Sequence, residues 1–116
     1  MNSTAASSPR FKEAINMESF LDGDGFFKEP KSWTPKLAKC LARQDGLQEL
    51  TRQHWQIITA LHEHYRRFGA TPPAFAHLCA CIHQDTHCVA RLFHSEREAW
   101  RLAGLPDPGE EAKAYL

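Results

Sequence analysis

The side chains of this 116-residue chain with the clearest chemistry are its four cysteines and seven histidines. Three of the cysteines, Cys79, Cys81 and Cys88, lie close together, and histidines are dense in the same stretch. A deprotonated thiol can act as a nucleophile, accept sulfur from another protein or bind a metal ion. Thiol transfer and metal binding are therefore the first two chemistries to consider.

Of the four cysteines, Cys88 is the best candidate for a reactive thiol, because it follows a polar loop at residues 85–87. Cys40 lies beside two leucines on the apolar face of a predicted helix, which is typical of a small core residue. Cys79 and Cys81 lie two positions apart on another predicted helix. Their side chains therefore point in different directions and are not expected to pair.

Cys79, His83 and His87 recur at four-residue intervals, which places them on one face of a helix if the helix continues that far. Thiolate and imidazole at that spacing can bind zinc or another transition metal. His77 and Cys81 form a second pair of this kind. The polar residues between the two histidines favour a helix break, and no complete ligand set is present. We therefore predict no metal and no cofactor. The alternative is a metal site formed by Cys79, His83 and His87.

The composition is that of a single globular domain, with 42% hydrophobic residues and 14 basic residues balanced by 14 acidic ones. A chain with no net charge has no overall attraction for nucleic acid or anionic lipid. No apolar stretch approaches the roughly 18–20 residues of a membrane span, and no secretory signal is evident. We therefore expect a cytoplasmic protein whose cysteines are thiols or ligands rather than disulfides.

The chain divides into a flexible extension at residues 1–17, one domain at residues 18–109 and a tail at residues 110–116. Small polar residues without periodicity begin the extension. Just inside the domain, Asp22–Gly25 is a turn signal flanked by pairs of apolar residues. Because Asp-Gly tolerates the positive φ of hairpin turns, a short N-terminal β-hairpin is predicted.

The rest of the domain predicts four or five short helices. Capping residues, apolar spacing and terminal glycines place them at about residues 34–45, 51–68, 73–83, 89–93 and 95–103. The last of these begins with a Ser-x-x-Glu capping box. Short helices cannot stack as a long bundle, so we expect a mainly α, orthogonal helical domain in which the helices cross at steep angles.

Several short pieces of this sequence occur together in one known family. In chain order they are Asp24–Phe26, Trp33-Thr34, Leu41-Ala42, Gln44–Leu47, Leu50-Thr51, His54-Trp55, Tyr65, Pro73-Ala74, Leu78, Leu92-Phe93 and Ala103–Pro106 with Pro108. In order and spacing they resemble the DsrC/TusE sulfur-relay family, which includes the gamma subunit associated with dissimilatory sulfite reductase. The resemblance covers about residues 21–109.

The resemblance implies a small helical protein with an N-terminal hairpin and a helix-turn-helix-like core. It further implies that sulfur is carried as a persulfide on a cysteine near the end of a mobile C-terminal arm. TusE-type members pass that sulfur toward tRNA thiolation. DsrC-type members use a second cysteine about ten residues earlier and act in sulfite reduction or sulfur oxidation. Members without these cysteines are thought to be regulatory.

This sequence departs from the family at the sites that matter most. The arm cysteine would fall at about Glu111 and the second cysteine at Trp100, while two family arginines are matched by Ala76 and His62. We therefore predict a non-catalytic interaction or regulatory protein that transfers no sulfur. The alternative is an active persulfide carrier in a sulfur relay or tRNA thiolation pathway that uses a relocated cysteine such as Cys88.

The resemblance implies a sulfur-relay or sulfite-reductase-type protein as partner, and a helix-turn-helix-like core makes DNA a second candidate. The cations available for DNA are Arg66, Arg67, Arg91, Arg97 and Arg101. They are spread over several helices among glutamates, which is typical of solvated helix faces. His54 and Trp55 would invite a catalytic role. A capping or packing position near the helix start and a core position explain them more simply.

Overall fold

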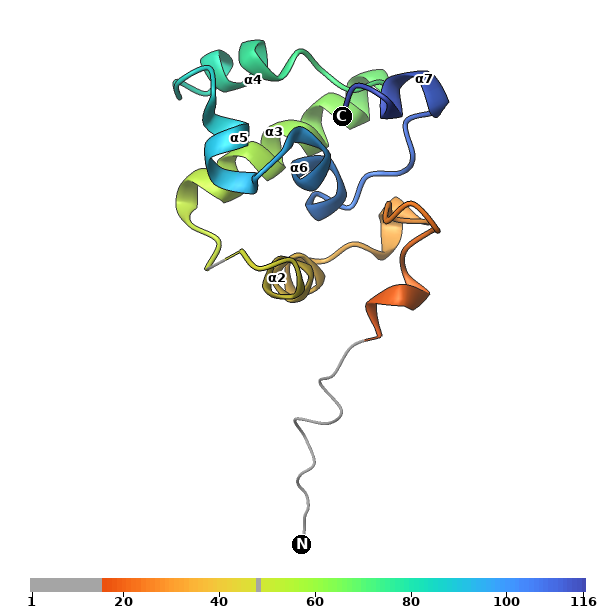
Figure 1. The fold of residues 1–116 in the computed structure, drawn as a ribbon. Helices are drawn as coiled ribbons and strands as arrows, with labels where there is room; N and C mark the ends of the chain where they lie inside the picture. The colour runs from red at the N-terminus through yellow and green to blue at the C-terminus, as the bar shows by residue number, and fades with distance from the viewer. Residues whose placement is uncertain (1–15, 48) are drawn as a thin grey trace, which may run out of the picture.

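The structure, a computed structural model, describes residues 16–47 and 49–116 and is built of helices and connecting loops (Figure 1). The α-helices are α2 (Pro35–Gln44), α3 (Arg52–Phe68), α4 (Phe75–Cys81), α5 (Cys88–Phe93), α6 (Glu96–Leu102) and α7 (Glu110–Lys113), with 3₁₀ turns at Met17–Ser19 and Pro30–Ser32. In this part of the chain no helix is both long and apolar enough to cross a membrane.

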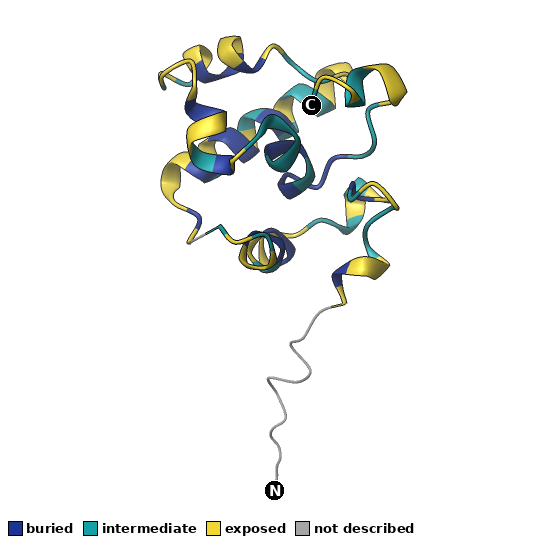
Figure 2. Ribbon diagram, viewed as in Figure 1, coloured by how far each residue is buried: buried dark blue, intermediate teal, exposed yellow. Residues whose placement is uncertain are grey.

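The two best-signalled helices form as predicted. The Thr34 hydroxyl accepts a hydrogen bond from the Leu37 N–H at 3.2 Å, which caps α2, and Gly46 leaves the helix with φ +83°. Thr51 caps α3, whose last turn ends at Gly69 with φ +74°. Each helix buries its apolar face against the core. Figure 2 shows both helices buried along one side and exposed along the other.

The helix α3 is the centre of the fold, with α4, α5 and α6 packed along it. In Figure 1, α2 is seen end-on while α3 runs across the view, so these two helices cross at a steep angle. The largest fully buried side chains come from the turn before α2 and from α2 to α6: Trp100, Phe26, Phe27, Phe93, Leu41, Ile57, Ile58, Leu61, Leu102, Cys79 and Cys88. The mainly helical fold class is therefore correct, while the helix-turn-helix core stays a prediction.

The predicted β-hairpin is wrong. One isolated antiparallel bridge, between Leu21 and Phe27, closes the turn, and the described residues contain no strand. The Asp22 carboxylate accepts the backbone N–H groups of Asp24 and Phe26, which favours a compact turn. Phe26 and Phe27 are consecutive and both buried, whereas successive side chains of a strand point to opposite faces.

The C-terminal end of α6 is fixed in place by a close backbone approach. The Trp33 indole donates to the Leu102 carbonyl at 2.8 Å, and His62 Nε2 donates to the Ala103 carbonyl at 2.7 Å. Gly104 lies directly against Trp33: a Cβ at this glycine would lie 2.1 Å from the indole Cδ1, at a backbone φ of +78°. This packing sets the direction in which the tail leaves the domain.

The two ends of the described chain show features that the sequence did not predict. Residues 1–15 of the predicted extension lie outside the described residues, while Met17 at its end is buried in the core. The segment at residues 110–116 begins with the short helix α7, which the sequence did not predict. The helix α4 is also shorter than the helix predicted at residues 73–83, because Ile82 ends it and His83 adopts φ +63°.

Candidate functional site

Sulfur atoms are concentrated in α4 and α5. Cys79 on α4 and Cys88 at the start of α5 form a disulfide, with their Cα atoms 6.0 Å apart. Both side chains are 0% exposed. The bond joins two helices that the loop at residues 82–87 also connects, so it adds a covalent link inside the core.

The expectation of free thiols is therefore wrong for these two residues. Cys88 was placed near a polar loop, but its side chain points inward from the first turn of α5 toward α4. In this oxidised state Cys88 has no thiol, so a carrier role for it requires reduction and exposure. The sequence argument failed because it inferred the state of the cysteines from the expected compartment, not from the helix faces that bring them together.

Cys81 is the cysteine with the greatest solvent exposure. It is free and exposed near the C-terminal end of α4, and its Sγ lies 3.4 Å from Nε2 of His77, one helical turn earlier. Cys40, the other free cysteine, is half-buried on α2. Of the two free thiols, Cys81 is therefore the more open to a second protein without a change in the fold.

The alternative metal site does not assemble. No group of three or more potential ligands is gathered in the described part of the chain. The sulfur of Cys79 is committed to the disulfide, and the positive φ of His83 breaks the helical spacing on which the site depended. His87 lies beyond that break, next to the start of α5.

The loop between α4 and α5 has its own contacts. The Gln84 N–H donates to the Cys79 carbonyl at 2.9 Å, and its side-chain amide donates to Gln56 on α3 at 2.8 Å. Arg91 pairs with Asp85 at 2.6 Å. The hydrogen bond from Arg91 is the main cause that lowers the pKa of Asp85. The loop is thus held to both flanking helices and to α3.

Trp100 and Glu111, the two positions that the resemblance sets against family cysteines, have different surroundings. Trp100 is 0% exposed, and its indole Nε1 donates to the Pro106 carbonyl at 2.7 Å, which anchors the start of the tail. Glu111 is exposed on α7. No cysteine follows Cys88 in the 116 residues. The tail as it stands in this sequence therefore offers no thiol.

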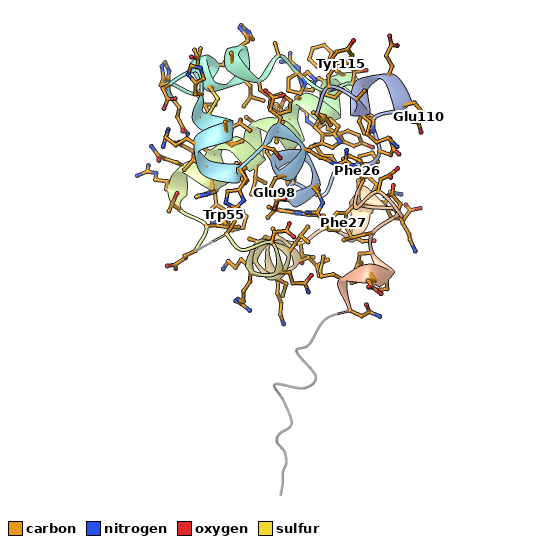
Figure 3. The ribbon with its side chains drawn as sticks, in the orientation of Figure 1. Phe26, Phe27, Trp55, Glu98, Glu110 and Tyr115 are labelled. Atoms are coloured by element: carbon orange, nitrogen blue, oxygen red, sulfur yellow. A yellow bond between two sulfur atoms is a disulfide. The ribbon has the colours of Figure 1, made fainter. Side chains whose placement is uncertain are left out.

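One lysine holds the tail against the body of the protein. Lys113 on α7 contacts Asp24 at 2.6 Å and Asp107 at 2.8 Å, and its side chain is 11% exposed. Hydrogen bonds to Asp107 and then to Asp24 raise the pKa of Lys113, and the bond from Lys113 lowers the pKa of Asp107. Figure 3 shows Glu110, the first residue of α7, on the same side of the molecule as Phe26, which belongs to the N-terminal turn at residues 21–27.

A second ionic cluster lies where α2, α6 and the N-terminal turn meet. Arg101 pairs with Asp45 and with Glu98 at 3.1 Å, and its Nε donates to the Gly25 carbonyl at 2.9 Å. Burial and the neighbouring Asp45 raise the pKa of Glu98 to about 8 despite Arg101. In the capping box predicted for α6, the Ser95 half forms, with its hydroxyl accepting the Glu98 N–H at 3.0 Å. The Glu98 carboxylate instead turns to Arg101.

His54 performs the capping role predicted for it. Its Nδ1 accepts the Thr51 N–H at 2.9 Å, and its Nε2 donates to the Leu92 carbonyl at 2.9 Å. Burial lowers its pKa, although the bond to Leu92 acts in the opposite direction. Trp55 is half-buried and lines a hollow of about 520 Å³ that Lys39 and Arg43 also border.

The arginines considered for DNA contact are largely engaged within the chain. Arg66 pairs with Glu63, Arg91 with Asp85, and Arg101 with Asp45 and Glu98. Arg97 donates to the Asp24 carbonyl and lies 4.9 Å from the centre of the Phe26 ring. These contacts leave little of the arginine set for phosphate groups.

Known proteins resemble this chain in both sequence and fold. It is 30% identical to the sulfurtransferase TusE of Salmonella choleraesuis over 95 residues, covering 75% of this chain and 86% of the relative. The crystal structure of dissimilatory sulfite reductase I (DsrI) matches with a TM-score of 0.69 and 27% identity, covering 78% of this chain and 88% of that one. The DsrC/gamma subunit of dissimilatory sulfite reductase from Pyrobaculum aerophilum matches with a TM-score of 0.65 and 31% identity, covering 78% and 83%.

The family model described as DsrC like protein matches residues 14–110, from the edge of the described region to the start of α7. That span includes α4 and α5 with their cysteines, the buried Trp100 and the anchor of the tail. Because the match covers most of the chain, and a relative named as a sulfurtransferase agrees with it, this protein belongs to the DsrC/TusE sulfur-relay family.

Proposed function

We propose that this protein acts in a sulfur relay as a persulfide carrier, and that Cys81 is the cysteine that holds the sulfur. The observation that carries the proposal is the exposed, free thiol of Cys81 beside His77 in a member of this family. The proposal follows the relocated-cysteine alternative, with Cys81 in place of Cys88. It fits the relatives named as sulfurtransferases.

The chemistry needs a thiolate that another protein can approach. The Cys81 thiolate would attack the outer sulfur of a donor persulfide, forming a new S–S bond as the bond to the donor sulfur breaks. The donor leaves as a thiolate, so the sulfane atom moves without net oxidation or reduction. His77 lies close enough to take the proton of the Cys81 thiol, and the exposed position gives a partner's cysteine access.

The tail would then have a different task from the family arm. We propose that Glu111 and Trp100 stand where family members carry cysteines, so that sulfur transfer no longer depends on this segment. A buried tryptophan cannot serve as an accessible nucleophile, and a carboxylate cannot hold sulfane sulfur. The partner would be a sulfur-relay or sulfite-reductase-type protein, and the place of action the cytoplasm.

Mass spectrometry tests the proposal directly. The protein is incubated with a persulfide donor, and its intact mass is measured with and without a thiol reductant. We expect the wild type and Cys40→Ser to gain one reducible sulfur atom, and Cys81→Ser to gain none. Equal loading of Cys81→Ser and the wild type would overturn the assignment to Cys81. No loading of any variant would overturn the carrier role.

A second function, a non-catalytic member that binds a relay partner or DNA, is favoured by one observation. The tail contains no cysteine and is held to the N-terminal turn through Lys113, an arrangement that suits a fixed binding surface. If the wild type takes up no sulfur but retains a relay protein in a pull-down, this function replaces the first. DNA is the weaker partner, because the arginines are engaged and the net charge is zero.

A further inference from the structure

The disulfide belongs to a helix that has few other attachments to the core. The helix α4 has only seven residues, too short to be stable in isolation, so tertiary contacts must hold it. Its buried side chains are Phe75, Leu78 and Cys79. Cys79 is thus one of three inward-facing anchors, and the anchor nearest the C-terminal end of the helix is a covalent bond to α5.

Cys81 depends on the same end of the helix. It lies two residues after Cys79 and points outward, and its sulfur meets His77 only while one full helical turn connects these two residues. Directly after it the chain leaves the helix at Ile82 and His83. Any loosening of this last turn would separate Cys81 from His77 without changing much of the core.

We propose that the Cys79–Cys88 disulfide is a redox switch for the Cys81 site: oxidised, it holds the turn that pairs Cys81 with His77, and reduced, it releases that turn. The switch regulates the carrier thiol and so rests on the proposed function. In the cytoplasm, the proposed place of action, a disulfide is more often transient or redox-sensing than a permanent staple. This pair therefore fits a bond that forms and breaks in use.

The redox step needs a dithiol reductant, protein or small molecule. One of its thiolates attacks a sulfur of the pair, the Cys79–Cys88 bond breaks, and a mixed disulfide forms with release of one cysteine as a thiolate. The second thiol of the reductant then attacks the mixed disulfide. The protein gains two electrons and two protons, and the reductant leaves as its own disulfide.

Reduction changes the packing as well as the bond. Two thiol sulfurs that are no longer bonded repel at bonding distance and must move apart. Cys79 and Cys88 are both fully buried, so the movement must displace neighbouring groups of the close-packed core. Apart from the bond, this end of α4 is held by the hydrogen bonds of Gln84 to the Cys79 carbonyl and to Gln56, and we infer that this last turn gives way first. Movement of the loop at residues 82–87 would break the contact between Gln84 and Gln56.

Alkylation of Cys81 by iodoacetamide measures the switch without any sulfur donor. In a Cys40→Ser background, Cys81 labelling rates are compared before and after reduction by a phosphine, with the fold checked by circular dichroism. Because Cys81 is already exposed, the main effect of reduction is loss of the His77 contact. We expect labelling of Cys81 to slow by about fivefold or more, because Nε2 of His77, 3.4 Å from the sulfur in the oxidised state, is no longer in place to take the proton as the sulfur attacks.

Two variants complete the experiment. His77→Ala should label slowly in both states, and Cys79→Ala with Cys88→Ala should behave like the reduced protein. Rates that agree within about twofold across the two redox states would overturn the switch, as would alkylation of Cys79 and Cys88 without reductant. A rate change without persulfide loading would leave the coupling and remove the carrier role. Persulfide loading without a rate change would leave the carrier role and remove the redox coupling.

Discussion

The α4–α5 region and the C-terminal tail differ in what they carry. The first holds a buried disulfide and an exposed thiol within ten residues of chain, on two short helices joined by a loop. The second holds no cysteine, and Lys113 fastens it to Asp24 across the molecule. The resemblance implies a family in which the mobile segment is also the one that bears sulfur. Here the thiols lie on one segment and the terminal arm is another.

Under the proposed function, the fold keeps its scaffold while the reactive group lies in a different place from the arm that the resemblance implies. Trp100 fills the core, and its indole anchors the tail through Pro106. A residue with that structural task cannot also be an exchangeable thiol. The tail gains fixed contacts by this arrangement, and the proposal assigns the reactive sulfur to the other region.

The largest expected effect is at Trp100. Its replacement by alanine removes a fully buried indole and the bond to Pro106, which should lower the free energy of unfolding by about 3–5 kcal/mol. Trp100→Cys should cost nearly as much, so a cysteine at this position would destabilise the protein before it could act. Urea unfolding followed by circular dichroism measures both variants.

Phe68→Ala is the matched control for Trp100, because that ring is 62% exposed and its removal should change the free energy of unfolding by less than about 0.5 kcal/mol. A Trp100→Cys protein as stable as the wild type would contradict the structural role of the tryptophan. The contrast between tail and α4–α5 region would then have no basis in packing.

The next effect concerns the other region. Reduction of the Cys79–Cys88 disulfide should lower the free energy of unfolding by about 2–3 kcal/mol, since the bond closes a loop of only nine residues' separation. The measurement is the urea midpoint with and without a phosphine reductant. Cys40→Ser should show the same response, because that cysteine is not part of the bond. A urea midpoint that is the same with and without the reductant would mean that the bond is absent in solution.

The helix α6 joins the two regions, and its Glu98 makes their common support sensitive to pH. Burial and Asp45 raise the pKa of Glu98 from 4.5 to about 8, so between these values the folded protein holds a proton that the unfolded chain has lost. Stability should therefore fall as the pH rises from about 5 to 8. With solvent screening at this partly exposed site, we expect a loss of about 1–2 kcal/mol.

Glu98→Gln removes the titrating group while keeping its shape. The variant should show a flatter dependence of the free energy of unfolding on pH than the wild type over the same interval, measured by urea unfolding at several pH values. A wild-type stability that rises steadily between pH 5 and 8 would show that Arg101 governs the ionisation of Glu98 more strongly than burial does.

The sequence predicted the elements whose signals are local. Thr34, Thr51 and Ser95 each mark a helix start, and glycines mark the ends of α2 and α3, because capping depends on residues only a few positions apart. The hairpin prediction was wrong because it extended a local turn signal to the residues on either side of the turn. A turn signal says where the chain reverses but not whether the flanking residues alternate, and Phe26 and Phe27 both face inward.

The candidate site was less accessible to sequence reasoning, because it depends on contacts between elements. The pairing of Cys79 with Cys88 follows from how α4 and α5 face each other, which no local pattern states. The exposure of Cys81 follows from the same packing. A usable signal was present: the i, i+4 pairing of His77 with Cys81 was visible in the sequence and is kept in the structure.

The smallest effect on global stability, and the sharpest on the tail, is expected from Lys113→Met. This change removes the contacts to Asp24 and Asp107 but keeps most of the apolar side chain. Amide hydrogen exchange should become faster in residues 110–116 while exchange in α3 stays unchanged, because local opening needs less free energy than global unfolding.

Lowering the pH should speed exchange in the tail as well. The pKa of Asp107 is held below its ordinary value, so its contact with Lys113 is present above pH 4 and is lost as the pH falls further. If exchange in the tail is already fast in the wild type and insensitive to both changes, Lys113 does not hold the tail. The arm would then be as mobile as the resemblance implies, and the two regions would differ only in their sulfur.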